Sequence, residues 1–104
     1  MAGERRAAAE SRGRRAESWA AWVLRLKGWR ILDRRVRIAG GEVDLIARRG
    51  RMVAFVEVKW RERAEDLDTA IDAYRLRRVA VAAERLAPRY VKAGDDMRID
   101  VMLL

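Results

Sequence analysis

The chain has 104 residues, with 24 basic and 16 acidic side chains and a formal net charge of +8. It contains no Cys and no His, which excludes disulfides, thiolate metal sites and His-based catalysis or zinc binding. A chain of this length is expected to form one domain. Any metal must be held by oxygen ligands, which suits Mg²⁺ or Mn²⁺.

The charge balance indicates a polyanionic partner. Arg accounts for 21 of the basic residues, and a small Arg-rich domain favours nucleic acid as the first candidate. The alternative is that the Arg content only reflects codon usage. No apolar run is long enough to span a membrane, and no signal-peptide core is present. We therefore expect a cytoplasmic protein with no membrane partner.

The N-terminal third is predicted to be a short arm and a helix. Residues 1–13 have no large apolar side chain after Met1 and are expected to be a disordered basic arm, with a helical extension as the alternative. A helical period follows from about Arg14 to Lys27, and Gly28 is a stop signal. One stripe of this helix is large and apolar and is expected to be core, with a membrane-surface or protein-docking role as the alternative: Trp19, Trp22, Val23 and Leu26.

Glu17 interrupts the opposite, Ala-rich side of the same helix. Small side chains there would allow a close approach to a sheet. An isolated Glu on such a surface is a candidate site residue. The competing interpretation, which the spacing alone favours, is a surface Glu near the helix start, where the helix dipole stabilises it.

Three strands are predicted next. A first strand over residues 29–38, bent near Asp33, leads through Gly40-Gly41 into a hairpin. A two-residue turn at Gly50-Arg51 suits type II′ geometry, and the paired residue numbers then sum to 101. This register places Asp44 opposite Glu57 and Glu42 opposite Lys59.

Two carboxylates and an ammonium group then converge in an apolar hairpin. Alternation puts Val53, Phe55, Glu57 and Lys59 on one face of the second arm. Buried charges are costly unless they are paired or bound to a metal. Asp44 and Glu57, with a backbone carbonyl and waters, would suit an octahedral Mg²⁺ site. Lys59 would orient or deprotonate a metal-bound water, as phosphodiester hydrolysis requires.

The pattern alone does not separate two interpretations. Cross-strand ion pairs, Glu42 with Lys59 and Glu57 with a neighbouring Arg, would also explain these side chains and would contribute little stability each. Nuclease chemistry and simple ion pairing therefore stand as equals at this point.

The rest of the chain predicts a helix and a strand. A polar loop over residues 61–68 leads into a helix from about Thr69 to Ala87, which is expected to stop before Pro88. Arg75 and Arg78 lie on one side of it, either as phosphate contacts or as a solvated face. A final strand, 98–104, would pair in parallel through a right-handed crossover. The expected class is α/β, with a mixed sheet flanked by helices.

Three motifs resemble a known family: Gly28-Trp-Arg-Ile-Leu-Asp-Arg, Gly40-Gly-Glu-Val-Asp-Leu-Ile-Ala and Phe55-Val-Glu-Val-Lys-Trp-Arg61. They resemble the small bacterial YraN-like (UPF0102) family, which is similar in fold to the PD-(D/E)XK nucleases, including archaeal Holliday-junction resolvases. The resemblance covers about residue 16 to the C-terminus. It implies a restriction-endonuclease-like αβββαβ core over residues 14–104. Because relatives usually continue past the last strand, the chain is expected to be short or truncated at its C-terminus.

The resemblance also assigns residues. It implies Asp44 and Glu57 as metal ligands, helped by the Val58 carbonyl, Lys59 as the catalytic lysine, and Glu17 as the helix-one glutamate of the site. The Arg that closes the family's third motif falls on Arg61. Two departures are Val43, where the superfamily name has Pro, and Leu76, where the family often has Gln.

Two main hypotheses follow. The first is a Mg²⁺- or Mn²⁺-dependent endonuclease that hydrolyses DNA, with branched or recombining DNA as a candidate substrate. In it Asp44, Glu57 and Glu17 form the metal site, Lys59 assists the water, and Arg61, Arg75 and Arg78 contact phosphates. The second is a non-catalytic nucleic-acid-binding module on the same fold. A homodimer would favour two-strand cuts, and the sequence leaves it open.

Overall fold

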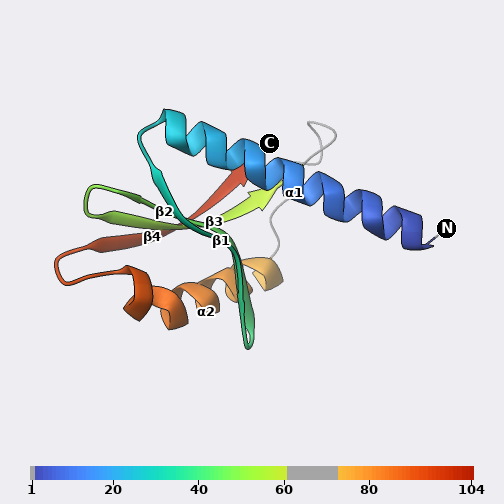
Figure 1. Cartoon of the computed structure of the whole chain (residues 1–104). Helices are drawn as coiled ribbons and strands as arrows, with labels where there is room; N and C mark the ends of the chain where they lie inside the picture. Colours follow the sequence, from blue (N-terminus) through green and yellow to red (C-terminus); the bar gives the residue numbers. More distant parts are fainter. Residues whose placement is uncertain (1, 61–72) are drawn as a thin grey trace.

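The computed structural model describes residues 2–60 and 73–104. In this part of the chain two helices lie on opposite sides of a four-stranded sheet (Figure 1). The elements are α1 (Ala2–Leu26), β1 (Arg30–Ile38), β2 (Gly41–Arg49), β3 (Met52–Lys59), α2 (Ala73–Tyr90) and β4 (Asp96–Leu103). The predicted α/β class and αβββαβ order are confirmed.

The sheet is mixed and has the order β1-β2-β3-β4. β1, β2 and β3 pair antiparallel, and β4 pairs parallel to β3. Gly50 has φ +61°, while Arg51 has no positive φ, which is the pattern of a type II′ turn. From this turn back to Leu45 and Val56 the register is the predicted one.

The core has one layer on each face of the sheet. On the α1 side, small helix residues pack against alternate strand residues. On the α2 side, an apolar stripe of the helix packs against the strand residues that face the other way. The α1-side cluster includes Ala16, Ala20, Ala21, Leu24, Trp29, Leu45, Ala47, Ala54, Val56 and Val58. The α2-side cluster includes Val43, Ile46, Val53, Phe55, Val79, Ala82, Ala83 and Leu86.

The C-terminal end of α1 follows the sequence signal. Gly28 has φ +90°, and the N–H groups of Trp29 and Gly28 donate to the carbonyls of Leu24 and Arg25 at 2.9 and 3.0 Å. This is a Schellman motif, and the Trp29 ring packs in the same cluster as Leu24. The start of α1 differs from the prediction. The helix begins at Ala2 rather than near Arg14, so residues 2–13, the expected disordered arm, are helical, and this end extends past the sheet (Figure 1).

The expectation that the large apolar stripe of α1 is core is wrong. Trp19, Trp22 and Leu26 are 62%, 59% and 79% exposed. The opposite side of the helix, with Glu17 among Ala residues, faces the sheet instead. A helical period identifies a face but does not say which face is packed. Small side chains allow the helix axis to lie close to the sheet, and this close approach carries Glu17 into the interior.

The prediction that helix α2 stops before Pro88 is wrong, because the helix continues to Tyr90. Pro88 lies in the last turn, and its side chain is exposed. Proline has no N–H group, so it donates no hydrogen bond to the carbonyl four residues earlier, and this exposed turn tolerates the loss. The N–H of Val91 still donates to the carbonyl of Ala87 at 2.8 Å. The predicted start of this helix near Thr69, and the loop before it, lie outside the described residues.

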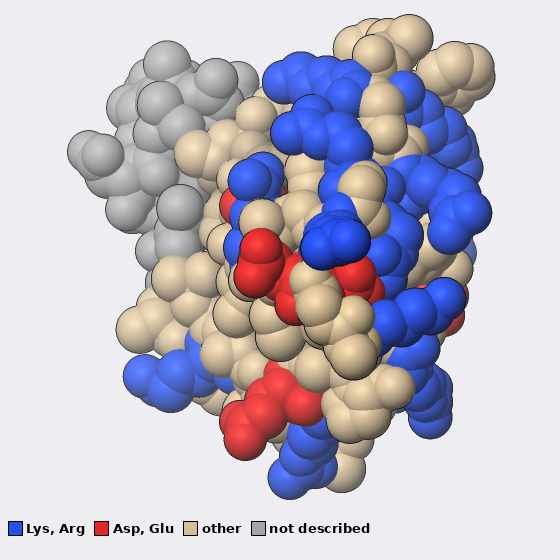
Figure 2. Space-filling view, turned by 90° about the vertical axis from the view of Figure 1, so that its left-hand side faces the viewer, with Lys and Arg blue, Asp and Glu red and all other residues tan. Residues whose placement is uncertain are grey.

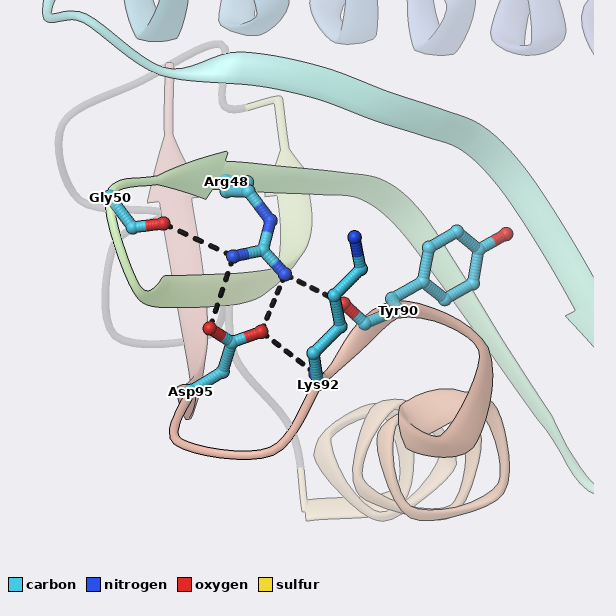
Figure 3. A network of polar contacts seen from close by, with 5 residues as sticks. All are labelled: Arg48, Gly50, Tyr90, Lys92 and Asp95. Carbon is cyan, nitrogen blue, oxygen red and sulfur yellow. Dashed lines mark hydrogen bonds and ion pairs between the residues drawn. The ribbon is translucent and has the colours of Figure 1, made fainter.

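An ion-pair network fixes the end of the sheet next to the β2–β3 turn (Figure 3). The Arg48 guanidinium donates to both oxygens of Asp95, at 2.6 and 3.2 Å, and to the carbonyls of Tyr90 and Gly50. The Lys92 N–H donates to the same Asp95 carboxylate at 2.7 Å. Bidentate, charge-assisted contacts of this kind are among the stronger polar interactions. They join β2, the end of α2 and the start of β4 into one unit.

Candidate functional site

β2 and β3 separate at the residues that the sequence singles out. Their backbone pairing ends at Leu45 and Val56. The prediction that Asp44 and Glu57 are ladder partners is therefore wrong. Beyond this point β2 continues against β1, while β3 continues against β4. The Asp44 carboxylate takes the place of the missing ladder bond, because its Oδ2 accepts from the Val58 N–H at 2.7 Å.

Opposite this point, β1 is distorted as well. Arg35 has φ +51°, a left-handed conformation that costs a side chain with a Cβ about 1–2 kcal/mol. The distortion sends two consecutive side chains toward α1. Arg34 donates to the Ser18 hydroxyl at 2.9 Å, and Arg35 Nε lies 3.3 Å from Glu17 Oε2. The predicted bend near Asp33 is also present, as a register shift between Ile31 and Asp33.

Glu57 is a buried carboxyl group in contact with both an acid and a base. Its side chain is 6% exposed, and Arg75 Nη2 lies 2.9 Å from its Oε1. This is a charge contact without hydrogen-bond geometry, since the same oxygen has no hydrogen-bond partner. Burial and the Asp44 charge raise the pKa of Glu57 to about 8, against the lowering effect of Arg75. The protonated form of Glu57 is thereby favoured, and its carboxyl group is hydrogen-bonded to that of Asp44.

The other two acids of the site are perturbed in the same direction. Burial raises the pKa of Asp44, although its bonds to the Val58 N–H and to Glu57 oppose the rise. Burial, and then the negative charge of Asp44, raise the pKa of Glu17 above its ordinary value. Glu17 Oε1 is also buried without a hydrogen-bond partner. The Asp44 carboxyl group on β2 thus interacts electrostatically with Glu17 on α1 and with Glu57 on β3.

One open cavity of about 310 Å³ lies between α1, the sheet and α2. Glu17, Asp44 and Arg75 line it, and Glu57 contacts Asp44 and Arg75 without being part of the lining. Val58, whose carbonyl the resemblance implies as a helper of the metal ligands, also lines the cavity. Further lining residues were not predicted as site residues: Gly13, Ala16, Arg35, Arg37, Glu42, Val43 and Trp60. The Arg-rich first strand is the sequence signal that points to Arg37. No sequence signal points to Arg35, because its position depends on the local distortion of β1.

Several predicted residues lie elsewhere. Among the described residues that line this cavity, neither Lys59 nor Arg78 is present. Lys59 is half-buried near the end of β3, and Arg78 lies over the Tyr74 ring at 5.9 Å. Glu42 pairs with Arg37 at 3.5 Å and, contrary to the prediction, has no ladder pairing with Lys59. Arg61 is outside the described residues.

The donor set fits a divalent cation in chemistry but is not a complete cage. Two of its carboxylate oxygens are buried without hydrogen bonds, and the charge repulsion that raises the pKa values is what a cation relieves. Within residues 2–60 and 73–104, no group of three or more acidic side chains is close enough to hold a metal ion without rearrangement. Asp44 and Glu57 would supply two ligands and waters the rest, as Mg²⁺ prefers.

The surface charge is mostly basic on the face that Figure 2 shows. This face contains the β2–β3 turn, and Lys and Arg side chains cover much of its upper and right-hand parts, whereas acidic side chains gather in a smaller area (Figure 2). A surface of this kind attracts polyanions. As for membranes, neither helix in the described part of the chain has the length and apolar content needed to cross one.

Comparison with known proteins identifies the family. The model of the uncharacterised protein family UPF0102 matches residues 16–104. A UPF0102 protein of Sphingopyxis alaskensis is 73% identical over 99 residues, which cover 95% of this chain and 85% of that protein. UPF0102 proteins of Rhizorhabdus wittichii and Erythrobacter litoralis are 65% and 57% identical over 100 residues, covering 96% of this chain and 85% and 86% of theirs. The chain therefore belongs to the uncharacterised protein family UPF0102.

Proposed function

We propose that the protein is a divalent-metal-dependent endonuclease that hydrolyses phosphodiester bonds in DNA. The observation that carries this proposal is the contact between Asp44 and Glu57 where β2 and β3 separate. Burial raises the pKa of both carboxyl groups, and the two are hydrogen-bonded to each other. Perturbed, interacting acids beside an open cavity are typical of catalytic sites, and the resemblance assigns the same two residues.

Each residue has a role in this proposal. Asp44 and Glu57 hold Mg²⁺ or Mn²⁺ together with waters, and Glu17, which lines the same cavity, adds negative charge. A cation in such a site polarises a phosphate oxygen and lowers the pKa of a bound water. Of the two described arginines that the sequence predicts as phosphate contacts, Arg75 lines the cavity and Arg78 does not. Lys59 is assigned to the water because it follows Glu57 by two residues on β3.

A non-catalytic nucleic-acid-binding module is the second candidate. The observation that favours it is the 2.9 Å contact between Arg75 and Glu57. This contact supplies a positive charge to the acid pair without a metal. In this alternative the carboxyl groups hold Arg75 in place, and the basic surface binds nucleic acid with a strong dependence on salt.

Cleavage assays distinguish the two candidates. Labelled linear duplex, single-stranded and four-way-junction DNA are incubated with Mg²⁺ or Mn²⁺ and wild type, Asp44→Asn or Lys59→Ala. Asn retains an oxygen that accepts from the Val58 N–H, so this variant removes the charge and spares the fold. Metal-dependent cleavage that is lost in both variants supports the nuclease. Binding to these DNAs without cleavage at any metal concentration supports the binding module.

A further inference from the structure

A second open cavity, of about 340 Å³, lies beside the C-terminal end of α1. Its lining contains three basic side chains, Lys27, Arg49 and Arg98, and one acidic side chain, Asp100. The indole of Trp29 also lines it. The first cavity shares none of these residues, so the two are separate places on the surface.

Trp29 holds the two guanidinium groups in fixed positions. The ring is buried, with 6% exposure, and is anchored by the Schellman motif that ends α1. Arg49 lies over it at 4.7 Å from guanidinium carbon to ring centroid, and Arg98 at 5.3 Å. Cation–π contacts at these distances are favourable. A long side chain held this way loses less freedom when it binds a ligand.

The charges of this cavity are not balanced by its own residues. Three cations and one carboxylate leave two net positive charges on its lining. The two guanidinium groups flank a single ring and are therefore separated by roughly 10 Å at most, about one Debye length at 0.1 M salt. Their repulsion is only partly screened at that separation, so an anion that contacts both groups would be stabilised.

Hydrogen-bond donors remain for such an anion. Arg49 donates to the Lys27 carbonyl at 3.2 Å, which uses one of its five N–H groups and covers the negative end of the α1 dipole. Arg98 Nε donates to Asp100 at 2.7 Å, and its two terminal nitrogens carry the other four N–H groups. Arg side chains with this geometry favour phosphate groups.

The spacing of the two cavities suits one nucleic-acid strand. Both border α1, the first through Glu17 and the second through Leu24. Two turns of helix separate these residues, about 10 Å at 1.5 Å per residue. One strand of duplex DNA advances about 3.4 Å along the axis per phosphate, so a short stretch of one strand is long enough to contact both cavities.

We infer that the cavity of Lys27, Trp29, Arg49 and Arg98 is a second phosphate-binding subsite, which holds the DNA backbone away from the bond to be cut. The identity of the polyanion rests on the proposed function. The position of the subsite rests on the cation–π pairs and the unbalanced charge alone.

Binding measurements test the subsite without chemistry. Fluorescence anisotropy of a labelled duplex is recorded in EDTA over a range of KCl for wild type, Arg49→Ala, Arg98→Ala and Arg77→Ala. Arg77 is an exposed arginine of α2 outside both cavities, so this control removes the same charge elsewhere. We expect Arg49→Ala and Arg98→Ala each to weaken binding about tenfold and to reduce the slope of log K against log salt by about one. Arg77→Ala should leave both nearly unchanged.

The conservative variants separate binding from folding. Arg49→Lys and Arg98→Lys keep the charge and should retain most of the salt slope, whereas a purely structural role would make them resemble the Ala variants. Equal effects of all three Ala substitutions would overturn the subsite. Titration with inorganic phosphate provides a further arm. Phosphate binding that Arg98→Ala abolishes, with DNA binding unchanged, would assign the cavity to free phosphate and overturn the DNA assignment.

Failure of this inference differs from failure of the proposed function. If wild type cleaves DNA and Arg49→Ala and Arg98→Ala bind like Arg77→Ala, only the subsite is wrong. If wild type never cleaves but the two substitutions weaken binding selectively, the subsite stands and the binding module replaces the nuclease.

Discussion

Replacing Glu57 with Gln should change how the stability of the metal-free protein depends on pH. Glu57 has an ordinary pKa of 4.5 in the unfolded chain and one of about 8 in the folded protein, because of burial and the Asp44 charge. The folded state therefore binds a proton that the unfolded state has released. This stabilising contribution is fully present below pH 4.5 and is lost as the pH rises through about 8.

The magnitude follows from the same two values. Each pH unit between them corresponds to about 1.4 kcal/mol, so the interval from 4.5 to about 8 sets an upper bound of about 5 kcal/mol. Relaxation of the site reduces this amount. Gln has the shape of the protonated acid and cannot ionise, so Glu57→Gln should lack this contribution to the pH dependence.

Urea unfolding in EDTA between pH 5 and pH 9 measures the effect. The two proteins should have similar free energies of unfolding at pH 5, and the Gln variant should be several kcal/mol more stable at pH 9. The difference between the two cancels the titration of groups that both share. A difference that is the same at pH 5 and pH 9 would refute the conclusion that Glu57 is desolvated beside Asp44.

Three further predictions concern the scaffold. Gly41→Ala should lose about 1–3 kcal/mol of stability in urea unfolding, because a Cβ there would lie 2.6 Å from the backbone oxygen of Arg78; unchanged stability would contradict this close packing. Trp22→Ala should cost no more than about 0.5 kcal/mol and Trp29→Ala about 3–5 kcal/mol, since only Trp29 is buried; equal losses in thermal unfolding would count against the exposed α1 stripe. The Arg48 contact lowers the pKa of Asp95 to about 2, so the stability advantage of wild type over Asp95→Asn should be complete above about pH 4 and shrink as the pH falls toward 2; a constant advantage across that range would rule out the ion pair.

Local signals in the sequence predict the scaffold well. Gly28 and Gly50 fix the end of α1 and the β2–β3 turn because both positions require a positive φ. The turn then sets the hairpin register as far as Leu45. Apolar alternation in β3 assigns Val53 and Phe55 to one face and Ala54 and Val56 to the other, as the two core clusters confirm.

The failures arise where tertiary contacts decide. The stripe of Trp19 and Trp22 is the strongest apolar signal of α1, yet the helix packs by its Ala side because that side allows the closer approach. Pro88 fits inside α2 because its turn is exposed to water. In both cases the tertiary environment of the helix decides the outcome, and local sequence patterns do not predict that environment.

The site was predicted in its residues more than in its geometry. The resemblance and the hairpin register both point to Asp44 and Glu57, and the structure brings their side chains into contact. The separation of β2 from β3 and the left-handed Arg35 were not predictable, because each is a departure from regular strand geometry. The Arg75–Glu57 pair joins residues far apart in the sequence, and only the fold shows it.

Titration of Mn²⁺ into the metal-free protein by isothermal calorimetry tests the central claim most directly. We expect one Mn²⁺-binding site per chain in wild type, and we expect this site to be lost in Asp44→Asn and in Glu57→Gln. It should be retained in Glu42→Gln, which removes a carboxylate from the same cavity lining. No Mn²⁺ binding by wild type, or equal binding by wild type and Asp44→Asn, would contradict the assignment of this carboxyl pair as a metal site.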